Sequence, residues 1–172
     1  MILLAALIGL FAKSVIDNQT SIAADVADGG HPMAPNFTLQ NVNGHGTTTL
    51  SSLRGKPVVL NFWASWCEPC RHSFPWLNEM QAKYADRGLV IIGVNVDRER
   101  AEAERFLRDV PAQFRIVYDP AGELAAHYDL PGMPVSYVIG TDGNVVERHV
   151  GFRNALRAER EAQLQKLLEK TQ

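Results

Sequence analysis

Two cysteines, three positions apart, are the residues of this sequence best suited to chemistry. Cys67 and Cys70 are the only cysteines of the chain and enclose Glu68 and Pro69. They follow an apolar run typical of a strand and come where a helix can begin, so Cys67 would lie at a helix N-terminus. Unpaired backbone N–H groups and partial positive charge at such a terminus favour a thiolate. The sequence therefore predicts thiol–disulfide exchange, with Cys67 as the nucleophile and Cys70 as the resolving thiol.

The two residues between the cysteines are expected to tune this pair. A free thiol with a pKa of about 8.5 is only about 3% ionised at pH 7, so its surroundings matter. Glu68 adds negative charge beside the thiolate and opposes the helix dipole, although Arg71 and His72 would offset it. Pro69 removes one N–H and stiffens the turn. Local electrostatics then sets whether the protein reduces or oxidises its partners.

Composition fits one globular domain with a short appendage. The chain has 172 residues, of which 46% are hydrophobic and 21% charged. A single bridge between residues three apart constrains the unfolded chain little, so stability must come from packing. The net charge is -2 and no basic block stands out, so we expect no nucleic-acid partner. No cofactor and no metal site is expected either.

An uncharged apolar run opens the chain. Residues 1–12 are too few for a span of about 20 residues but suit the core of a signal peptide. Small residues at 21 and 23 are compatible with cleavage near Ala23 or Ala24. We expect residues 1–24 to be a signal peptide or membrane anchor, 25–35 a linker and 36–172 the domain. A buried or frayed N-terminal helix is the alternative.

Strands alternate with helices through the rest of the chain. Hydrophobic patterns and turn residues predict these elements: a hairpin at 37–39 and 47–50, strands at 56–64, 89–96 and 114–118, helices at 68–85, 98–108 and 122–128, a hairpin at 135–139 and 145–150, and a closing helix from Asn154, as its N-cap, to Lys170. This order predicts an α/β fold whose central mixed sheet carries helices on both faces.

Three parts of the sequence together resemble the thioredoxin fold. They are the segment from Asn61 to Cys70, the Gly-Met-Pro-Val sequence at 132–135 and the closing helix. The added N-terminal hairpin, the extra strand and helix between the two halves and the signal-like segment resemble the exported TlpA/ResA/DsbE group of thiol-disulfide oxidoreductases. The resemblance covers residues 35–168.

This resemblance implies a substrate-binding surface beside the cysteines. It implies that the Met133–Pro134 peptide bond is cis and that the Met133 backbone pairs with an extended substrate segment. Trp66 is expected to be partly exposed and to dock partner proteins together with Met133, whereas Trp63 is expected in the core.

The resemblance also exposes two missing acids. Thioredoxins have a buried Asp where this chain has Asn61, and ResA-like members often have a Glu where it has Ser73. Asn61 and Ser73 can form hydrogen bonds but cannot act as bases. Glu68, the acid within the motif, is therefore the candidate acceptor of the Cys70 proton.

The predicted function is that of an exported reductant of protein disulfides, periplasmic or otherwise extracytoplasmic and either released or anchored by its N-terminal segment. By resemblance, the client is apocytochrome c or a copper-site assembly protein, and a membrane thiol reductase supplies electrons. A disulfide oxidase or isomerase is one alternative.

A copper-binding chaperone of thioredoxin fold is another alternative, with His127 or His149 as a distant ligand. Such carriers use a longer cysteine spacing, however. Peroxiredoxin chemistry is disfavoured because Leu60 and Ala64 occupy its Pro and Thr/Ser positions. Haem attachment is disfavoured because Arg71 directly follows the second cysteine.

Overall fold

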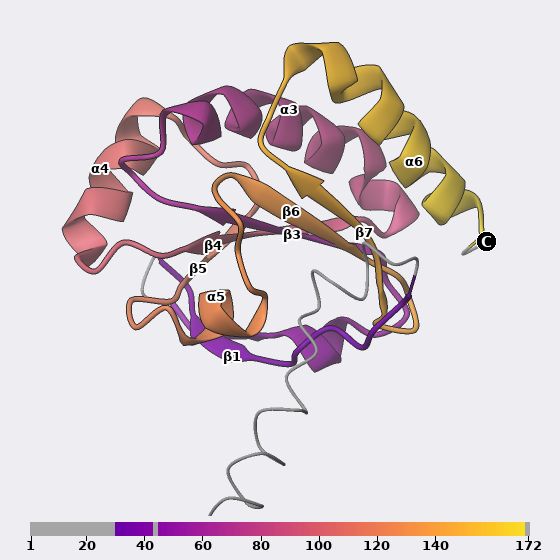
Figure 1. Cartoon of the computed structure of the whole chain (residues 1–172), viewed down its shortest axis with the longest axis horizontal. Helices are drawn as coiled ribbons and strands as arrows, with labels where there is room; N and C mark the ends of the chain where they lie inside the picture. The colour runs from indigo at the N-terminus through magenta and orange to yellow at the C-terminus, as the bar shows by residue number, and fades with distance from the viewer. Residues whose placement is uncertain (1–29, 43–44, 171–172) are drawn as a thin grey trace, which may run out of the picture.

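A five-stranded mixed sheet forms the centre of the molecule (Figure 1). The structure is a computed structural model that describes residues 30–42 and 45–170. The strands lie in the order β5-β4-β3-β6-β7. Their bounds are β3 Val58–Trp63, β4 Val90–Asn95, β5 Arg115–Tyr118, β6 Val135–Ile139 and β7 Val145–Val150. The segment expected as a signal peptide or anchor, residues 1–24, lies outside the described residues.

Strand β3 occupies the middle of this sheet. It runs parallel to β4, which is parallel to β5, and antiparallel to β6, which pairs with β7 in a hairpin. All six residues of β3 are buried, as its nearly continuous apolar sequence predicts for a strand covered on both faces. The C-terminal end of this central strand leads directly to the cysteines.

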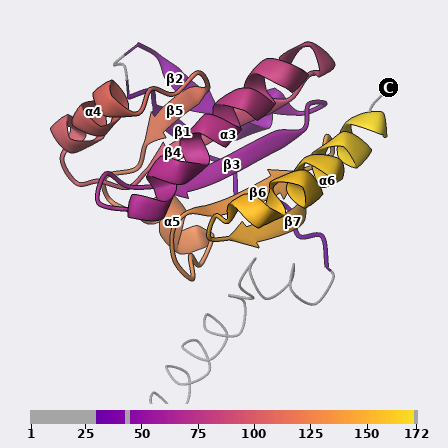
Figure 2. The ribbon, with the colours of Figure 1, turned by 90° about the horizontal axis from the view of Figure 1, so that it is seen from above.

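Helices cover both faces of the sheet, as the sequence predicts. Helices α3 (Glu68–Tyr84), α4 (Arg100–Asp109) and α6 (Arg157–Glu169) cover one face, and α3 and α6 lie side by side (Figures 1 and 2). The opposite face carries α5 (Glu123–His127) and the N-terminal hairpin of β1 (Thr38–Gln40) and β2 (Thr47–Thr49). The expected thioredoxin-like architecture with an added hairpin is thus confirmed.

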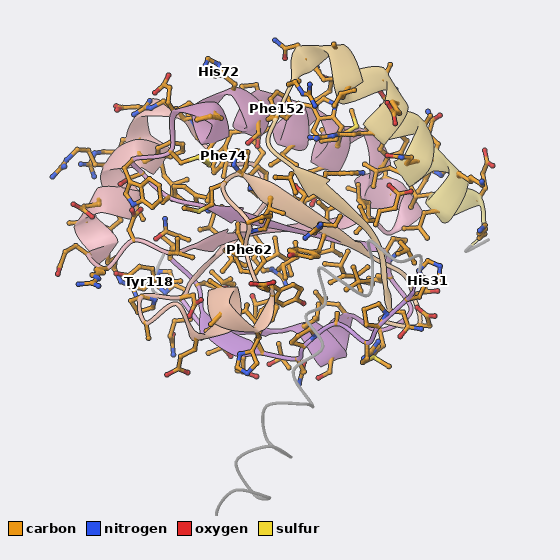
Figure 3. The ribbon with its side chains drawn as sticks, viewed as in Figure 1. His31, Phe62, His72, Phe74, Tyr118 and Phe152 are labelled. Atoms are coloured by element: carbon orange, nitrogen blue, oxygen red, sulfur yellow. A yellow bond between two sulfur atoms is a disulfide. The ribbon has the colours of Figure 1, made fainter. Side chains whose placement is uncertain are left out.

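Alternating side chains of β3 divide the core into two layers. Trp63 faces α3 and α4, where its ring lies 5.0 Å from that of Phe74 and 4.7 Å from that of Phe106. Phe62 faces the other layer, with its ring 5.2 Å from that of Tyr128. Figure 3 shows Phe74 and Phe62 on opposite sides of the sheet. Trp63 is fully buried, which confirms its expected place in the core.

The closing helix begins later than the sequence predicts. Asn154 is not its N-cap: residues Asn154–Leu156 form a 3-10 turn, and α6 starts at Arg157. The Leu156 N–H donates to the Arg153 carbonyl oxygen at 3.0 Å. Because this tight turn satisfies a donor through the backbone, no side-chain cap is used.

The described start of the chain packs along the turn between β6 and β7. The Ala34 N–H donates to the Gly143 carbonyl oxygen at 3.0 Å, and the Val145 N–H donates to that of Pro32 at 2.8 Å. The last residues of the expected linker 25–35 therefore lie against the domain. Within residues 30–42 and 45–170, none of the helices has the length and apolar character needed to cross a membrane.

Candidate active site

The two cysteines lie where β3 turns into α3. Strand β3 ends at Trp63, a short turn follows, and Cys67 is the N-cap of α3. The Cys67 N–H donates to the Ala64 carbonyl oxygen at 3.2 Å, which closes the turn. Cys67 and Cys70 form a disulfide with an S–S distance of 2.08 Å and their Cα atoms 5.3 Å apart. The redox pair is therefore present in its oxidised form at the predicted helix start.

The two sulfurs differ in their access to solvent. Cys67 is 4% exposed, whereas Cys70 is completely buried. Trp66, directly before Cys67, is 69% exposed, as expected for a docking side chain. A partner protein would therefore reach Cys67 first, and this order fits Cys67 as the attacking thiol.

Few backbone donors face the Cys67 side chain. An N-cap side chain usually accepts a hydrogen bond from the N–H of the second or third helical residue. Here the second residue is Pro69, which has no N–H, and the N–H of the third, Cys70, donates to the Cys67 carbonyl oxygen at 3.1 Å. Cys67 accordingly makes no side-chain cap bond.

Glu68 lies on the surface among basic side chains. Its carboxylate is 3.9 Å from the Arg71 Nε atom and 3.8 Å from the His72 Nε2 atom, and its side chain is 74% exposed. Arg71 is also shared with Asp109, at 3.7 Å. Among the contacts of the described residues, none joins Glu68 to Cys70.

Two polar side chains are buried in the layer that holds Cys70. Asn61 lies on the face of β3 between Val59 and Trp63, and its Oδ1 atom accepts a hydrogen bond from the Ser136 hydroxyl at 2.9 Å. Its Nδ2 atom is buried and has no partner among the described residues. The Ser73 hydroxyl donates to the Cys70 carbonyl oxygen at 2.8 Å. An unpaired amide donor thus lies on the face of β3 that α3 covers.

The loop that carries Met133 adjoins this layer. The Met133–Pro134 bond is cis, as the resemblance implies, and Met133 packs against the apolar cluster that contains both cysteines. The Gly151 N–H donates to the Pro134 carbonyl oxygen at 2.8 Å, and Arg160 Nη2 donates to the Gly151 carbonyl oxygen at 3.1 Å. Burial lowers the pKa of Arg160, and the charge of Arg153 adds to this. Helix α6 thereby supports the loop.

Sequence reasoning missed a buried acid behind the turn. Asp97 lies two residues after the end of β4 and is 1% exposed. Its carboxylate accepts the Ser65 N–H at 2.9 and 3.1 Å and the Ser65 hydroxyl at 3.0 Å. A signal was available, because β3 and β4 are neighbouring parallel strands and both residues follow the strand ends.

Other polar groups of the described chain are used locally. His127 Nδ1 lies 2.7 Å from the Glu123 carbonyl oxygen, and His149 Nε2 lies 2.9 Å from the Glu147 carboxylate. Within residues 30–42 and 45–170, no group of three or more His, Cys, Asp or Glu side chains could hold a metal ion.

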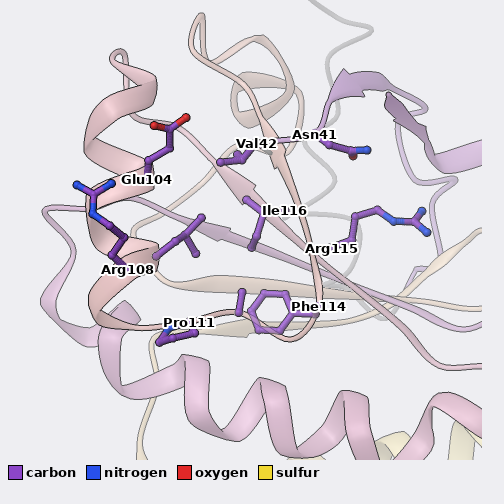
Figure 4. A pocket seen from close by; sticks show the side chains of 10 residues that line it. Asn41, Val42, Glu104, Arg108, Pro111, Phe114, Arg115 and Ile116 are labelled. Atoms are coloured by element: carbon purple, nitrogen blue, oxygen red, sulfur yellow. The ribbon is translucent and has the colours of Figure 1, made fainter. Parts of the chain in front are cut away.

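A hollow of about 760 Å³ lies away from the cysteines, between α4 and β5. Figure 4 shows Phe114 and Ile116 on its β5 side and Glu104 and Arg108 on its α4 side. Neither cysteine lines it. The redox pair, next to Trp66 in the sequence, is therefore separate from this hollow.

Comparison with known proteins agrees with this site. The model of the AhpC/TSA family matches residues 31–148. The chain is 34% identical over 118 residues to a thiol-disulfide oxidoreductase ResA of Bacillus cereus, covering 69% of this chain and 68% of that protein. It is 32% identical over 145 residues to ResA of Geobacillus kaustophilus, covering 84% of this chain and 79% of that protein.

A solved structure from Chlorobium tepidum is also similar. It is described as a putative thiol:disulfide interchange protein DsbE, with a TM-score of 0.77 and 43% identity over 80% of this chain and 96% of that one. Fold, site and relatives agree on the same chemistry. This chain therefore belongs to the AhpC/TSA family and is a thiol-disulfide oxidoreductase of the ResA/DsbE type.

Proposed function

We propose that the protein is an exported reductant of protein disulfides, with Cys67 as the attacking thiol and Cys70 as the resolving thiol. The single observation that carries this assignment is the difference in access between the two sulfurs. Cys67 keeps 4% of its surface exposed and directly follows the exposed Trp66, whereas Cys70 is completely buried. A client disulfide can approach the first sulfur only.

The reaction is a pair of thiol–disulfide exchanges. The Cys67 thiolate attacks one sulfur of the client disulfide, and the other client sulfur leaves as a thiolate. The Cys70 thiolate then attacks the Cys67 sulfur of the mixed disulfide and releases the second client sulfur. Two electrons pass to the client, and the protein is left with the Cys67–Cys70 bond. A membrane thiol reductase would restore the dithiol.

The start of α3 supports reduction rather than oxidation. A strong oxidant stabilises its reduced form through the thiolate. Here Pro69 withholds one backbone donor from that thiolate, and Glu68 places a negative charge in the first turn. Both features leave the Cys67 thiolate weakly stabilised, which favours the disulfide and makes the dithiol a good electron donor. The exposed position of Glu68 supports this tuning role over proton transfer.

Asn61 is assigned to the buried sulfur. Its Nδ2 atom has no partner among the described residues, and it lies on the face of β3 that α3 covers. On reduction, this amide would donate a hydrogen bond to the Cys70 thiolate. Such a bond would stabilise the attacking form of Cys70 without accepting its proton.

The surroundings of the cysteines suit protein substrates. Trp66 offers an apolar contact, and the backbone of Met133, before Pro134, would pair with an extended client segment. Apocytochrome c or a copper-site assembly protein is the proposed client class, in the periplasm or another extracytoplasmic space. Mass spectrometry of the mature N-terminus tests export: cleavage near residue 24 supports it, and an intact Met1 on a cytosolic protein contradicts it.

The assignment of the thiols is tested by trapping. The Cys70→Ser variant is expected to accumulate a mixed disulfide with a client, because the resolving step is lost. The matched Cys67→Ser variant is expected to trap none, because Cys70 is buried. Non-reducing gels of both variants after incubation with oxidised insulin measure this. Trapping by Cys67→Ser and not by Cys70→Ser would reverse the two roles.

A further inference from the structure

A buried carboxylate holds the turn that presents Cys67. Asp97 is 1% exposed and lies at the C-terminal end of β4. The Ser65 N–H donates to both carboxylate oxygens, at 2.9 and 3.1 Å. The Ser65 hydroxyl donates to one of them at 3.0 Å. Asn95 Nδ2 donates to the same carboxylate at 2.7 Å. Three donors from two residues, Ser65 and Asn95, thus converge on the Asp97 carboxylate.

Hydrogen bonds, and not an ion pair, hold this carboxylate. None of the ion pairs found within residues 30–42 and 45–170 involves Asp97. Its side-chain oxygens accept all three of these hydrogen bonds, as a carboxylate does. Its charge is balanced by dipoles and acts on its surroundings more strongly than an exposed, screened charge would.

The position of this charge connects it to the nucleophile. Ser65 lies two residues before Cys67, and the Cys67 N–H closes the same turn on the Ala64 carbonyl oxygen at 3.2 Å. Val96 strengthens the junction, because its N–H donates to the Trp63 carbonyl oxygen at 3.1 Å. The end of β4 is therefore fixed to the segment that carries the thiol.

We propose that Asp97 is a positioning residue for Cys67, which fixes the turn before the nucleophile and opposes its thiolate with a fixed negative charge. This inference rests on the proposed reductant function and deepens it. By disfavouring the thiolate, Asp97 favours the disulfide and so makes the dithiol a stronger electron donor.

Other ionisable groups at this edge of the sheet come from β5 and α3. Burial raises the pKa of Tyr118, the charge of Glu99 raises it further, Arg100 opposes this, and Asp97 adds a smaller contribution. The Tyr118 hydroxyl donates to the Arg98 carbonyl oxygen at 2.6 Å. On the α3 side, the ionisable side chains are Glu68, Arg71 and His72. These side chains are unchanged in the variants below, so their contributions cancel in the comparison.

The test compares Asp97→Asn with a matched control in the full chain carrying Cys70→Ser, so that Cys67 is the only thiol. Asn keeps the size of the side chain and one oxygen acceptor for the Ser65 N–H but removes the charge. Asp119→Asn is the control: Asp119 lies just after β5, is 3% exposed, and accepts the Ala125 N–H at 3.0 Å. The rate of Cys67 alkylation by iodoacetamide is measured from pH 5 to 10, which gives the Cys67 pKa.

Asp97→Asn is expected to lower the Cys67 pKa and to raise the thiolate fraction at pH 7 about threefold, the effect of removing a nearby like charge. Asp119→Asn is expected to leave both unchanged. A Cys67 pKa equal to the unsubstituted value in Asp97→Asn would overturn the proposal and leave Asp97 a purely structural role.

A second variant tests the same idea with the opposite sign. Ser65→Ala retains the carboxylate but removes the hydroxyl that partly balances its charge, so the thiolate fraction is expected to fall below the unsubstituted value. A rise, or no change, contradicts the proposal even if Asp97→Asn does not fold. Reduction of insulin by the protein with both cysteines tests the reductant function separately, because it does not depend on the result for Asp97.

Discussion

Hydrogen-bond donors at the start of α3 decide how strongly the Cys67 thiolate is stabilised. Pro69 removes the donor of the second helical position, and the Cys70 N–H is used by the Cys67 carbonyl oxygen. Glu68 adds a negative charge to the first turn, and Arg71, whose Nε atom lies 3.9 Å away, reduces its effect. In the proposed reductant, Pro69 would therefore carry much of the bias toward a reducing couple.

Replacing Pro69 tests this directly. Pro69→Ala restores a backbone N–H that can reach the Cys67 sulfur, and a charge-assisted hydrogen bond is worth about 1.4 kcal/mol. We expect the Cys67 pKa to fall by about one unit and the reduction potential to rise by up to about 30 mV where the thiolate dominates. The pH dependence of alkylation and equilibration with glutathione measure the two effects. A Cys67 pKa that rises would contradict the account.

The buried amide of Asn61 gives the corresponding prediction for Cys70. Asn61→Leu keeps the size of the side chain but removes the donor, so release of the client from the mixed disulfide should slow by about tenfold, the effect of one hydrogen bond to a charged group. Stopped-flow measurement of product release, with the rate of the first attack as the internal control, checks this. Equal slowing of both steps would point to general damage instead.

Local spacing predicts the chemistry of single residues but not their partners. Cys67, Cys70 and the proline at 134 are visible in the sequence because short motifs encode them. The contact of Asp97 with Ser65 is not, because it depends on the register that places Trp63 beside Asn95 in parallel strands. Because both strands are nearly continuous apolar runs, their sequences indicate that the two strand ends meet at one edge of the sheet but not which residues pair there.

At the level of elements, helices α3 and α6 are joined by a polar cluster at their surface. The Glu161 carboxylate of α6 accepts the Tyr84 hydroxyl of α3 at 2.6 Å, and Gln165 Nε2 donates to the Tyr84 hydroxyl at 2.8 Å. Lys83 Nζ lies 2.5 Å from the same carboxylate. The hydrogen bond from Lys83, followed by that from Tyr84, lowers the pKa of Glu161 below its usual value. This cluster fastens the closing helix over the active-site helix.

The lowered pKa of Glu161 predicts a pH-dependent contribution to stability. An acid whose pKa is lower in the folded state stabilises the fold above its ordinary pKa, and this contribution is lost as the pH falls through the lowered value. Glu161→Gln should therefore reduce the free energy of unfolding at pH 7 by about 0.5 to 1 kcal/mol, since the pair lies near the surface, and by little near pH 3. Urea unfolding at both pH values measures the difference.

Glu169→Gln serves as the control for that comparison, because Glu169 lies exposed in the last turn of α6 and forms no ion pair with the described residues. A loss of stability that is the same at pH 3 and pH 7 would show that Glu161 acts through packing rather than charge.

The sequence predicts the presence of these elements better than their ends and neighbours. The apolar pattern with Leu164 and Leu168 predicts α6 correctly, and both side chains are buried. Its start at Arg157 instead of Asn154 follows from the 3-10 turn, which local residue types do not determine. The pairing of Tyr84 with Glu161 depends on how two helices lie on the sheet, which neither helix encodes alone.

For the whole molecule, the fold brings distant segments to one edge of the central sheet. The end of β3 supplies the turn and Cys67, the end of β4 supplies Asp97, and the loop before β6 supplies Met133 and Pro134. Helix α6 supports that loop through Arg160 and Gly151. The redox pair is thus held by several elements, which sets both its access and its electrostatic surroundings.

The reduction potential of the Cys67–Cys70 couple tests the central claim most directly. The full chain is equilibrated with glutathione buffers of known ratio, and the fraction of dithiol is measured after alkylation. A reductant with a weakly stabilised thiolate should have a potential near or below about -270 mV, the value of thioredoxin. A potential near about -120 mV, that of a strong disulfide oxidant, would contradict the account.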